Sequence, residues 1–257
     1  RAAEVTSERL GDPARAVTLY EQILEQERGD GRAQERLRAL YGELGRYNEL
    51  ARLLSMLIDQ ADSPALRSAL RIDLARLQLE RFQNPGDATD TLRSVLEEDP
   101  DHEDAAGLLA AIFEKGDKHA ELAELQAALV ERARAKDDAV LELARMVTLG
   151  EILELRLKDA RRALETYDQI LGRDPHHRGA LEAVARLAES RGTWDKAETA
   201  LARLLETASG AHAVELALRL ASARKELGNE AGVEDALKRA LEADPPNADV
   251  RERLGQL

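Results

Sequence analysis

Cysteine is absent from this sequence of 257 residues, which excludes disulfide bonds and thiolate metal sites. Aromatic residues make up only 3% of the chain, and β-branched residues are too sparse for a large sheet. No apolar run reaches the roughly 18 residues that a membrane-spanning helix needs, so we expect no membrane insertion. Ala, Leu, Glu and Arg dominate instead, and this composition is typical of helical repeats and coiled coils.

Basic residues are outnumbered, since Lys and Arg total 37 against 50 Asp and Glu, and the net charge is −13. Such a chain repels nucleic acid and anionic membrane surfaces unless a basic patch overrides the field, and no basic run is present. We therefore expect a protein or peptide partner, with basic patches on it favoured by electrostatic steering, and no nucleic acid. The lack of cysteine, of a signal segment and of a membrane segment in these residues slightly favours the cytoplasm, and the compartment otherwise stays open.

A recurring helical pattern organises the chain. Residues 158–175 place Ala163 four residues before Tyr167 and seven and eight residues before an aliphatic pair, and the same pattern starts at Ala16 with Tyr20. Offsets of four, seven and eight lie on one face of a helix. Equivalent anchors recur at spacings of 34 to 41 residues, and Gln126 is the one polar residue at the fourth position after an anchor. The anchors are Ala16, Leu50, Ala88, Leu122, Ala163, Ala197 and Val233.

The anchors predict about seven helical hairpins, each made of a first and a second helix. Gly45, Gly116 and Gly192 precede second helices, where a helix C-cap with positive φ favours glycine. The chain opens in mid-pattern without Met, so we expect a fragment of a longer protein that forms a single solenoid over residues 1–257. Second helices are predicted near 13–28, 47–60, 86–98, 118–135, 159–172, 194–208 and 230–243, with an extra terminal helix at 247–256.

Residues 181–201 carry the best single match to a known repeat, with Trp194 after the turn and Ala197 in the second helix. Their spacing resembles the tetratricopeptide repeat family. The resemblance implies an all-α, right-handed superhelical solenoid whose first helices line a concave, partner-binding face. The sequence departs from the family at Arg38, which stands where the family has a small residue of the first helix.

A second period of two hairpins is superposed on the first, because Ala16 and Ala88 are 72 residues apart and Ala88 and Ala163 are 75 apart. Odd hairpins share a tight turn with Asp or Asn, and a longer first helix follows each even hairpin. We therefore predict a two-hairpin super-repeat in which the helix at 139–157 is longer than the one at 176–191.

Two sets of residues have predicted roles. One set is expected to pack the repeats: Ala16, Tyr20, Leu50, Ala88, Ala163, Tyr167, Trp194, Ala197 and Val233. The other set takes exposed positions on the first helices, where the resemblance implies a partner-binding groove: Arg36, Glu43, Arg76, Glu80, Phe113, Arg186, Glu189, Arg219, Ser222 and Lys225. Core packing is the alternative for Phe113, and a merely solvated face is the alternative for the charged residues.

Catalytic chemistry finds little support in the sequence. Asp174, His176 and His177 could suggest a metal site, but a polar turn at a helix start explains them, and zinc needs three or four convergent ligands. No nucleophile triad, nucleotide-binding loop or zinc-protease pattern is present. We therefore predict a non-catalytic chain without a cofactor or a metal.

The favoured function is a scaffold or adaptor that binds a partner peptide or helix on its concave face. One alternative is a regulatory or assembly module of a larger enzyme. Another is a self-assembling structural module, because Val250, Leu254 and Leu257 lie at the spacing of a core-facing helix and predict end-to-end self-association. The identity of the partner stays open.

Overall fold

The computed structural model describes residues 12–256, and every regular element in that range is helical. The all-α class predicted from the sequence is therefore confirmed. The helices are α2 (Pro13–Gln26), α3 (Gly31–Glu43), α4 (Tyr47–Gln60), α5 (Pro64–Glu80), α6 (Pro85–Glu98), α7 (Glu103–Lys115), α8 (His119–Ala135), α9 (Ala139–Glu151), η1 (Ile152–Arg156), α10 (Ala160–Arg173), α11 (Arg178–Arg191), α12 (Trp194–Thr207), α13 (Gly210–Glu226), α14 (Glu230–Ala243) and α15 (Ala248–Gly255).

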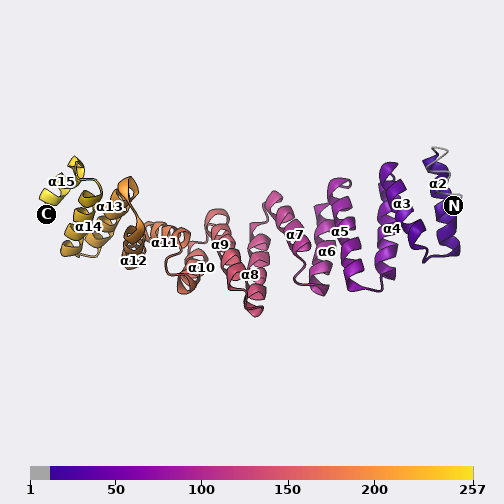
Figure 1. Cartoon of the computed structure of the whole chain (residues 1–257), viewed down its shortest axis with the longest axis horizontal. Helices are drawn as coiled ribbons and strands as arrows, with labels where there is room; N and C mark the ends of the chain where they lie inside the picture. Colours follow the sequence, from indigo (N-terminus) through magenta and orange to yellow (C-terminus); the bar gives the residue numbers. More distant parts are fainter. Residues whose placement is uncertain (1–11, 257) are drawn as a thin grey trace. The chain divides into compact units, whose positions relative to one another are not determined.

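The helices form two compact units, and within each unit every helix packs against the next one along the chain (Figure 1). The first unit is described from residue 12 to residue 117 and holds α2 to α7. The second is described from residue 118 to residue 256 and holds α8 to α15. A single continuous solenoid over residues 1–257 stays a prediction.

Small residues at the anchors allow the helices to approach closely. Ala16, Ala88, Ala163 and Ala197 are all 0% exposed, because each faces the neighbouring helices with only a methyl group. Tyr20, Tyr167 and Val233 are buried as well. Two predicted packing residues differ from this pattern, since Leu50 and Trp194 are only half-buried. Trp194 keeps part of its indole in solvent because it begins α12 directly after the turn.

First helices of two lengths alternate along the chain, as the second period predicts. The long ones are α5 and α13, with 17 residues each, and α9, whose 13 residues continue into the five of η1. The short ones are α3 and α7, with 13 residues each, and α11, with 14. The helix from Ala139 onward is therefore longer than α11.

Helix caps follow the same alternation. In the odd hairpins a side chain of Asp12, Asn84, Asp159 or Asn229 accepts a hydrogen bond from a backbone N–H in the first turn of the second helix. The second helices α4, α8 and α12 begin without a side-chain cap. The Asp and Asn turns seen in the sequence are thus the N-caps of alternate second helices.

The turns before the second helices correct one prediction. Gly45 and Gly192 adopt positive φ angles of 68° and 67°, as expected for C-cap glycines. Gly116 has a φ of −92°, and the positive φ of this turn falls on Asp117 instead, at 52°. An aspartate tolerates this conformation better than most residues with a side chain, which explains how the turn closes one residue later.

The predicted start of the chain, residues 1–10, lies outside the described residues, and so does Leu257. In α15, Val250 is 0% exposed and Leu254 is half-buried. End-to-end association through this helix stays a prediction. None of the helices in residues 12–256 is long and apolar enough to cross a membrane.

Gln126 provides a test of the repeat packing, because it is 5% exposed and its side-chain oxygen has no hydrogen-bond partner among residues 12–256. A buried polar atom without a partner costs stability. We expect Gln126→Leu to raise the free energy of unfolding by about 1–2 kcal/mol, measured by urea denaturation. Leu201 holds the equivalent place in α12 and is 0% exposed, so Leu201→Gln is the reverse control and should destabilise. A Gln126→Leu variant less stable than the parent chain would contradict this account.

Candidate functional site

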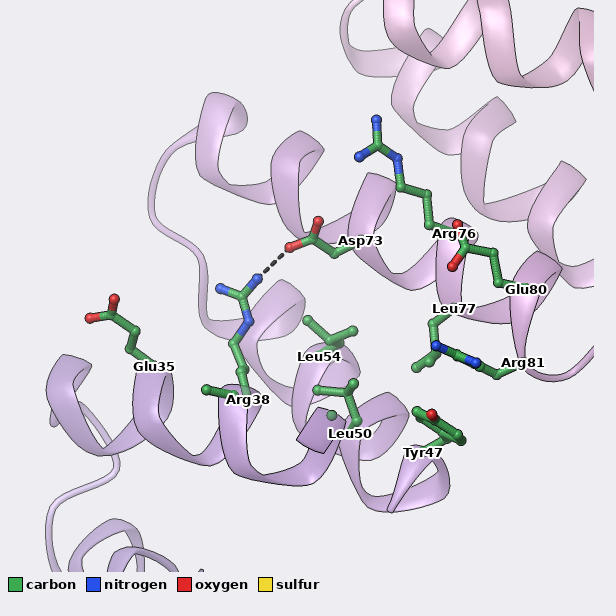
Figure 2. A pocket seen from close by; sticks show the side chains of 12 residues that line it. Glu35, Arg38, Tyr47, Leu50, Leu54, Asp73, Arg76, Leu77, Glu80 and Arg81 are labelled. Carbon is green, nitrogen blue, oxygen red and sulfur yellow. Dashed lines mark hydrogen bonds and ion pairs between the residues drawn. The ribbon is translucent and has the colours of Figure 1, made fainter. Parts of the chain in front are cut away.

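A groove of about 670 Å³ opens between α3, α4 and α5 of the first unit (Figure 2). We call it the α3–α5 groove. The two first helices form its walls, and the second helix α4 closes its floor. Its lining residues are Glu35, Arg38, Ala39, Gly42, Tyr47, Leu50, Leu54, Asp73, Arg76, Leu77, Glu80 and Arg81.

The floor of the α3–α5 groove is apolar and its α3 wall is low. Leu54 and Leu77 are buried, and the half-buried Leu50 lies beside them. On α3 the groove is bordered by Ala39 and Gly42, and a Cβ added at Gly42 would meet no described atom within 4 Å apart from its chain neighbours and the adjacent backbone of α3. These small residues leave space that larger side chains would fill.

Charged side chains surround this floor. Arg38 of α3 and Asp73 of α5 form an ion pair across the groove, and Figure 2 shows them pointing toward each other. At the other end, the guanidinium of Arg81 lies 4.8 Å from the centre of the Tyr47 ring, within the range of a cation–π contact. Glu35 and Glu80 make no ion pair with any residue of the range 12–256. The groove therefore offers two carboxylates that a partner could pair with.

The groove contains some of the predicted site residues and excludes others. Arg76 and Glu80 line it, whereas Arg36 lies on an exposed part of α3 that does not. The prediction for Phe113 is wrong, because its side chain is 3% exposed and belongs to the core. The guanidinium of Arg93 lies 6.0 Å from the centre of the Phe113 ring.

The second unit pairs the charges that the sequence assigned to its groove. Arg186 of α11 donates to Glu154 of η1 at 2.6 Å, although Arg186 keeps over half of its side chain exposed. Arg219 of α13 donates to Glu189 of α11 at 2.8 Å. Lys225 is exposed near the end of α13. Successive first helices are thus linked by ion pairs.

A π-helical turn positions Glu154 for this network. The carboxylate of Glu154 is 8% exposed, and it also accepts a hydrogen bond from the hydroxyl of Tyr167 at 3.0 Å. Gly150 makes room for the Tyr167 ring, since a Cβ there would lie 2.7 Å from the Cε1 atom of the ring. Burial, followed by the nearby Glu154 carboxylate, raises the pKa of Tyr167 well above its usual value.

Two of the five histidines cap helices with their side chains. The Nδ1 atoms of His102 and His177 accept backbone N–H groups at the starts of α7 and α11. Asp174 accepts from the backbone N–H of His176. In the described part of the chain, no three His, Asp or Glu residues gather where they could hold a metal ion.

Comparison with known proteins matches residues 152–213 to the tetratricopeptide repeat family. This part of the chain carries tetratricopeptide repeats. The matched segment runs from η1 to the start of α13 and includes the Glu154–Arg186 pair. No curated protein matches the chain.

The solved structures that match the chain include two tetratricopeptide repeat proteins. The C-terminal part of a repeat protein from Cytophaga hutchinsonii is 15% identical, with a TM-score of 0.47 over 98% of each chain. A repeat protein from Parabacteroides merdae is 12% identical, with a TM-score of 0.41 over 99% of this chain and 95% of that one. Naa15/Naa10 bound to HypK-THB is 17% identical, with a TM-score of 0.54 over 94% of this chain and 36% of that one. The last likeness shows the fold alone.

Sequence reasoning missed the crossing ion pair of the α3–α5 groove and the Tyr47–Arg81 contact. One signal was present, because Arg38 replaces a small residue of the repeat and a long side chain at that place must reach across to the next first helix. For Phe113 the signal was Tyr41. Phe113 stands nine residues before the anchor Leu122, and Tyr41 stands nine residues before the anchor Leu50. Because Tyr41 is buried, the equivalent place of Phe113 is expected to be buried as well.

Two of the buried tyrosines, Tyr41 and Tyr167, predict how stability depends on pH. Burial raises the pKa of Tyr41 and Tyr167 above the ordinary value of 10.0, and hydrogen bonds to Glu21 and Glu154 add to the effect. Above about pH 10 the unfolded chain loses these protons while the folded chain keeps them, so stability falls as pH rises. We expect Tyr41→Phe with Tyr167→Phe to flatten the fall of the unfolding free energy between about pH 9.5 and 11.5. Parallel curves for this variant and the parent chain would contradict the assignment.

Proposed function

We propose that this chain is a non-catalytic interaction scaffold whose docking surface is the α3–α5 groove. The single observation that carries the proposal is the groove itself, with its apolar floor between two first helices and charged residues along its rim. Stacked hairpins supply such a surface in a preformed state, so binding costs little ordering of the scaffold. A partner side chain over Leu50 and Leu54 would bury apolar area, while the rim charges set its register.

The second unit supports this choice of surface by contrast. Its first helices already pair Arg186 with Glu154 and Arg219 with Glu189. A partner would have to break these pairs, and Glu154 would then be left nearly buried without its cation. We therefore assign the second unit a supporting role and the first unit the binding role.

The proposed partner is a protein or peptide that carries basic patches. The net charge of −13 steers such a partner toward the chain, and Glu35 and Glu80 are positioned to receive its cations. The same charge argues against nucleic acid as the partner. One structure similar in fold, Naa15/Naa10 bound to HypK-THB, is itself a complex between chains.

Filling the groove tests the proposal. Ala39 lines the α3–α5 groove and is the ninth residue of α3, whereas Ala111 is the exposed ninth residue of α7 and lines none of the described cavities. Peptides selected from a random library against the parent chain should lose affinity at least about tenfold for Ala39→Trp, because the indole would occupy the peptide's place. Ala111→Trp adds the same side chain to an equivalent helix and should bind as the parent does. Equal binding by all three proteins would move the docking surface elsewhere.

A further inference from the structure

A second cavity of about 290 Å³ adjoins the α3–α5 groove in the first unit. Glu35 and Arg38 line both cavities. The second cavity lies between the first half of α3, the end of α4 and the start of α5. Its other lining residues are Gly29, Gly31, Gln34, Leu57, Gln60, Ala61, Asp62, Leu66 and Leu70. The two cavities therefore follow one another along the same pair of first helices.

The ion pair between Arg38 and Asp73 marks the boundary between the cavities. Asp73 lines the larger cavity only, and Arg38 reaches it from α3. Both side chains are about a third or more exposed, so their pairing contributes little to stability and the two side chains can rearrange when a partner binds. Apolar surface continues on the far side of the pair, where Leu66 is 51% exposed. The pair thus crosses a longer groove without closing it.

The length of the combined groove suits a short extended segment. The lining residues of α3 run from Gly31 to Gly42, about 16 Å at 1.5 Å per residue. Those of α5 run from Leu66 to Glu80, about 21 Å by the same rise. An extended chain advances about 3.3 Å per residue, so about five to seven residues fill this length.

A carboxylate lies at each end of the combined groove, and Arg81 also lines the end at Glu80. Asp62 lies at the end formed by the α4–α5 connection, and Glu80 lies at the opposite end of α5. Neither carboxylate has an ion-pair partner among the residues that the structure describes. Figure 2 shows the guanidinium of Arg76 pointing away from Leu50 and Tyr47, so this cation does not cover the floor.

We propose that the two cavities form one groove crossed by the Arg38–Asp73 pair, and that the groove binds an extended segment of about six residues with a basic side chain at each end. The proposal rests on the proposed function, since it names the partner of the same surface. The apolar middle of the segment lies over Leu50, Leu54 and Leu70, and its basic ends pair with Asp62 and Glu80.

Three synthetic peptides test the charge of the occupant. Each has seven residues with alternating Val and Thr in the middle, which favours the extended form, and Lys, Gln or Glu at both ends. By fluorescence anisotropy, the Lys-ended peptide should bind the full chain at least about fivefold more tightly than the Gln-ended one, and the Glu-ended one most weakly. Asp62→Lys with Glu80→Lys should reverse this order. Glu226→Lys with Glu230→Lys changes the net charge equally outside the groove and should preserve it.

Comparing a short and a long peptide tests whether the two cavities act as one groove or as two separate sites. A three-residue peptide with a Lys at one end should bind at least about tenfold more weakly than the seven-residue one, and Leu66→Ser should weaken only the longer peptide. Equal affinity for the two lengths, or for all three end charges, would overturn the inference and leave the scaffold proposal standing. Failure of every peptide, together with library binders insensitive to Ala39→Trp, would overturn both.

Discussion

Close approach between neighbouring helices is the constraint on which the rest of this structure depends. In four of the second helices an alanine with no exposed surface faces the adjacent helices, so that backbones meet with only a methyl group between them. Helical hairpins of this size cannot bury their apolar faces alone and must stack on their neighbours. The anchor alanines set how near the neighbours come, and the larger side chains at the fourth, seventh and eighth positions fill the space that remains.

The alternation of long and short first helices explains where a groove can open. In the first unit α5 has 17 residues and α3 only 13, so the walls of the α3–α5 groove differ in length. The shorter wall ends in small residues, Ala39 and Gly42, and the floor of α4 is left accessible between the two. In the second unit the long helix gains a π-helical turn, and this turn directs Glu154 inward to Tyr167 and Arg186. Both units therefore pair charges between first helices, but the pair in the first unit is exposed beside an open groove, whereas Glu154 in the second unit is nearly buried.

Helix positions and most of the core follow from the spacing of apolar residues, because that spacing depends only on the geometry of a single helix. Contacts between hairpins do not follow in the same way. Phe113 shows the difference, since one residue along a helix turns a side chain by about 100° and moves it from the exposed face to the core. The π-helical turn at residues 152–156 is another case, because the partners of its Glu154 lie on α10 and α11, more than ten residues away in the sequence. The open α3–α5 groove depends on what its neighbours leave unfilled.

Charge pairing in this chain follows the repeat spacing, and this gives a rule that sequence reasoning could use. Arg38 pairs with Asp73 at a separation of 35 residues, Arg186 with Glu154 at 32, and Arg219 with Glu189 at 30. In a stacked array each hairpin contacts only its neighbours, so a charge on one first helix meets the charge about one repeat away. Among the preceding residues, opposite charges at that separation narrow the candidate partners of Arg186 to Glu151 and Glu154, and the candidate partner of Arg219 to Glu189. Glu80 has Arg46 and Lys115 at separations of 34 and 35 residues and still forms no ion pair with a described residue, so the spacing alone does not fix which charges pair.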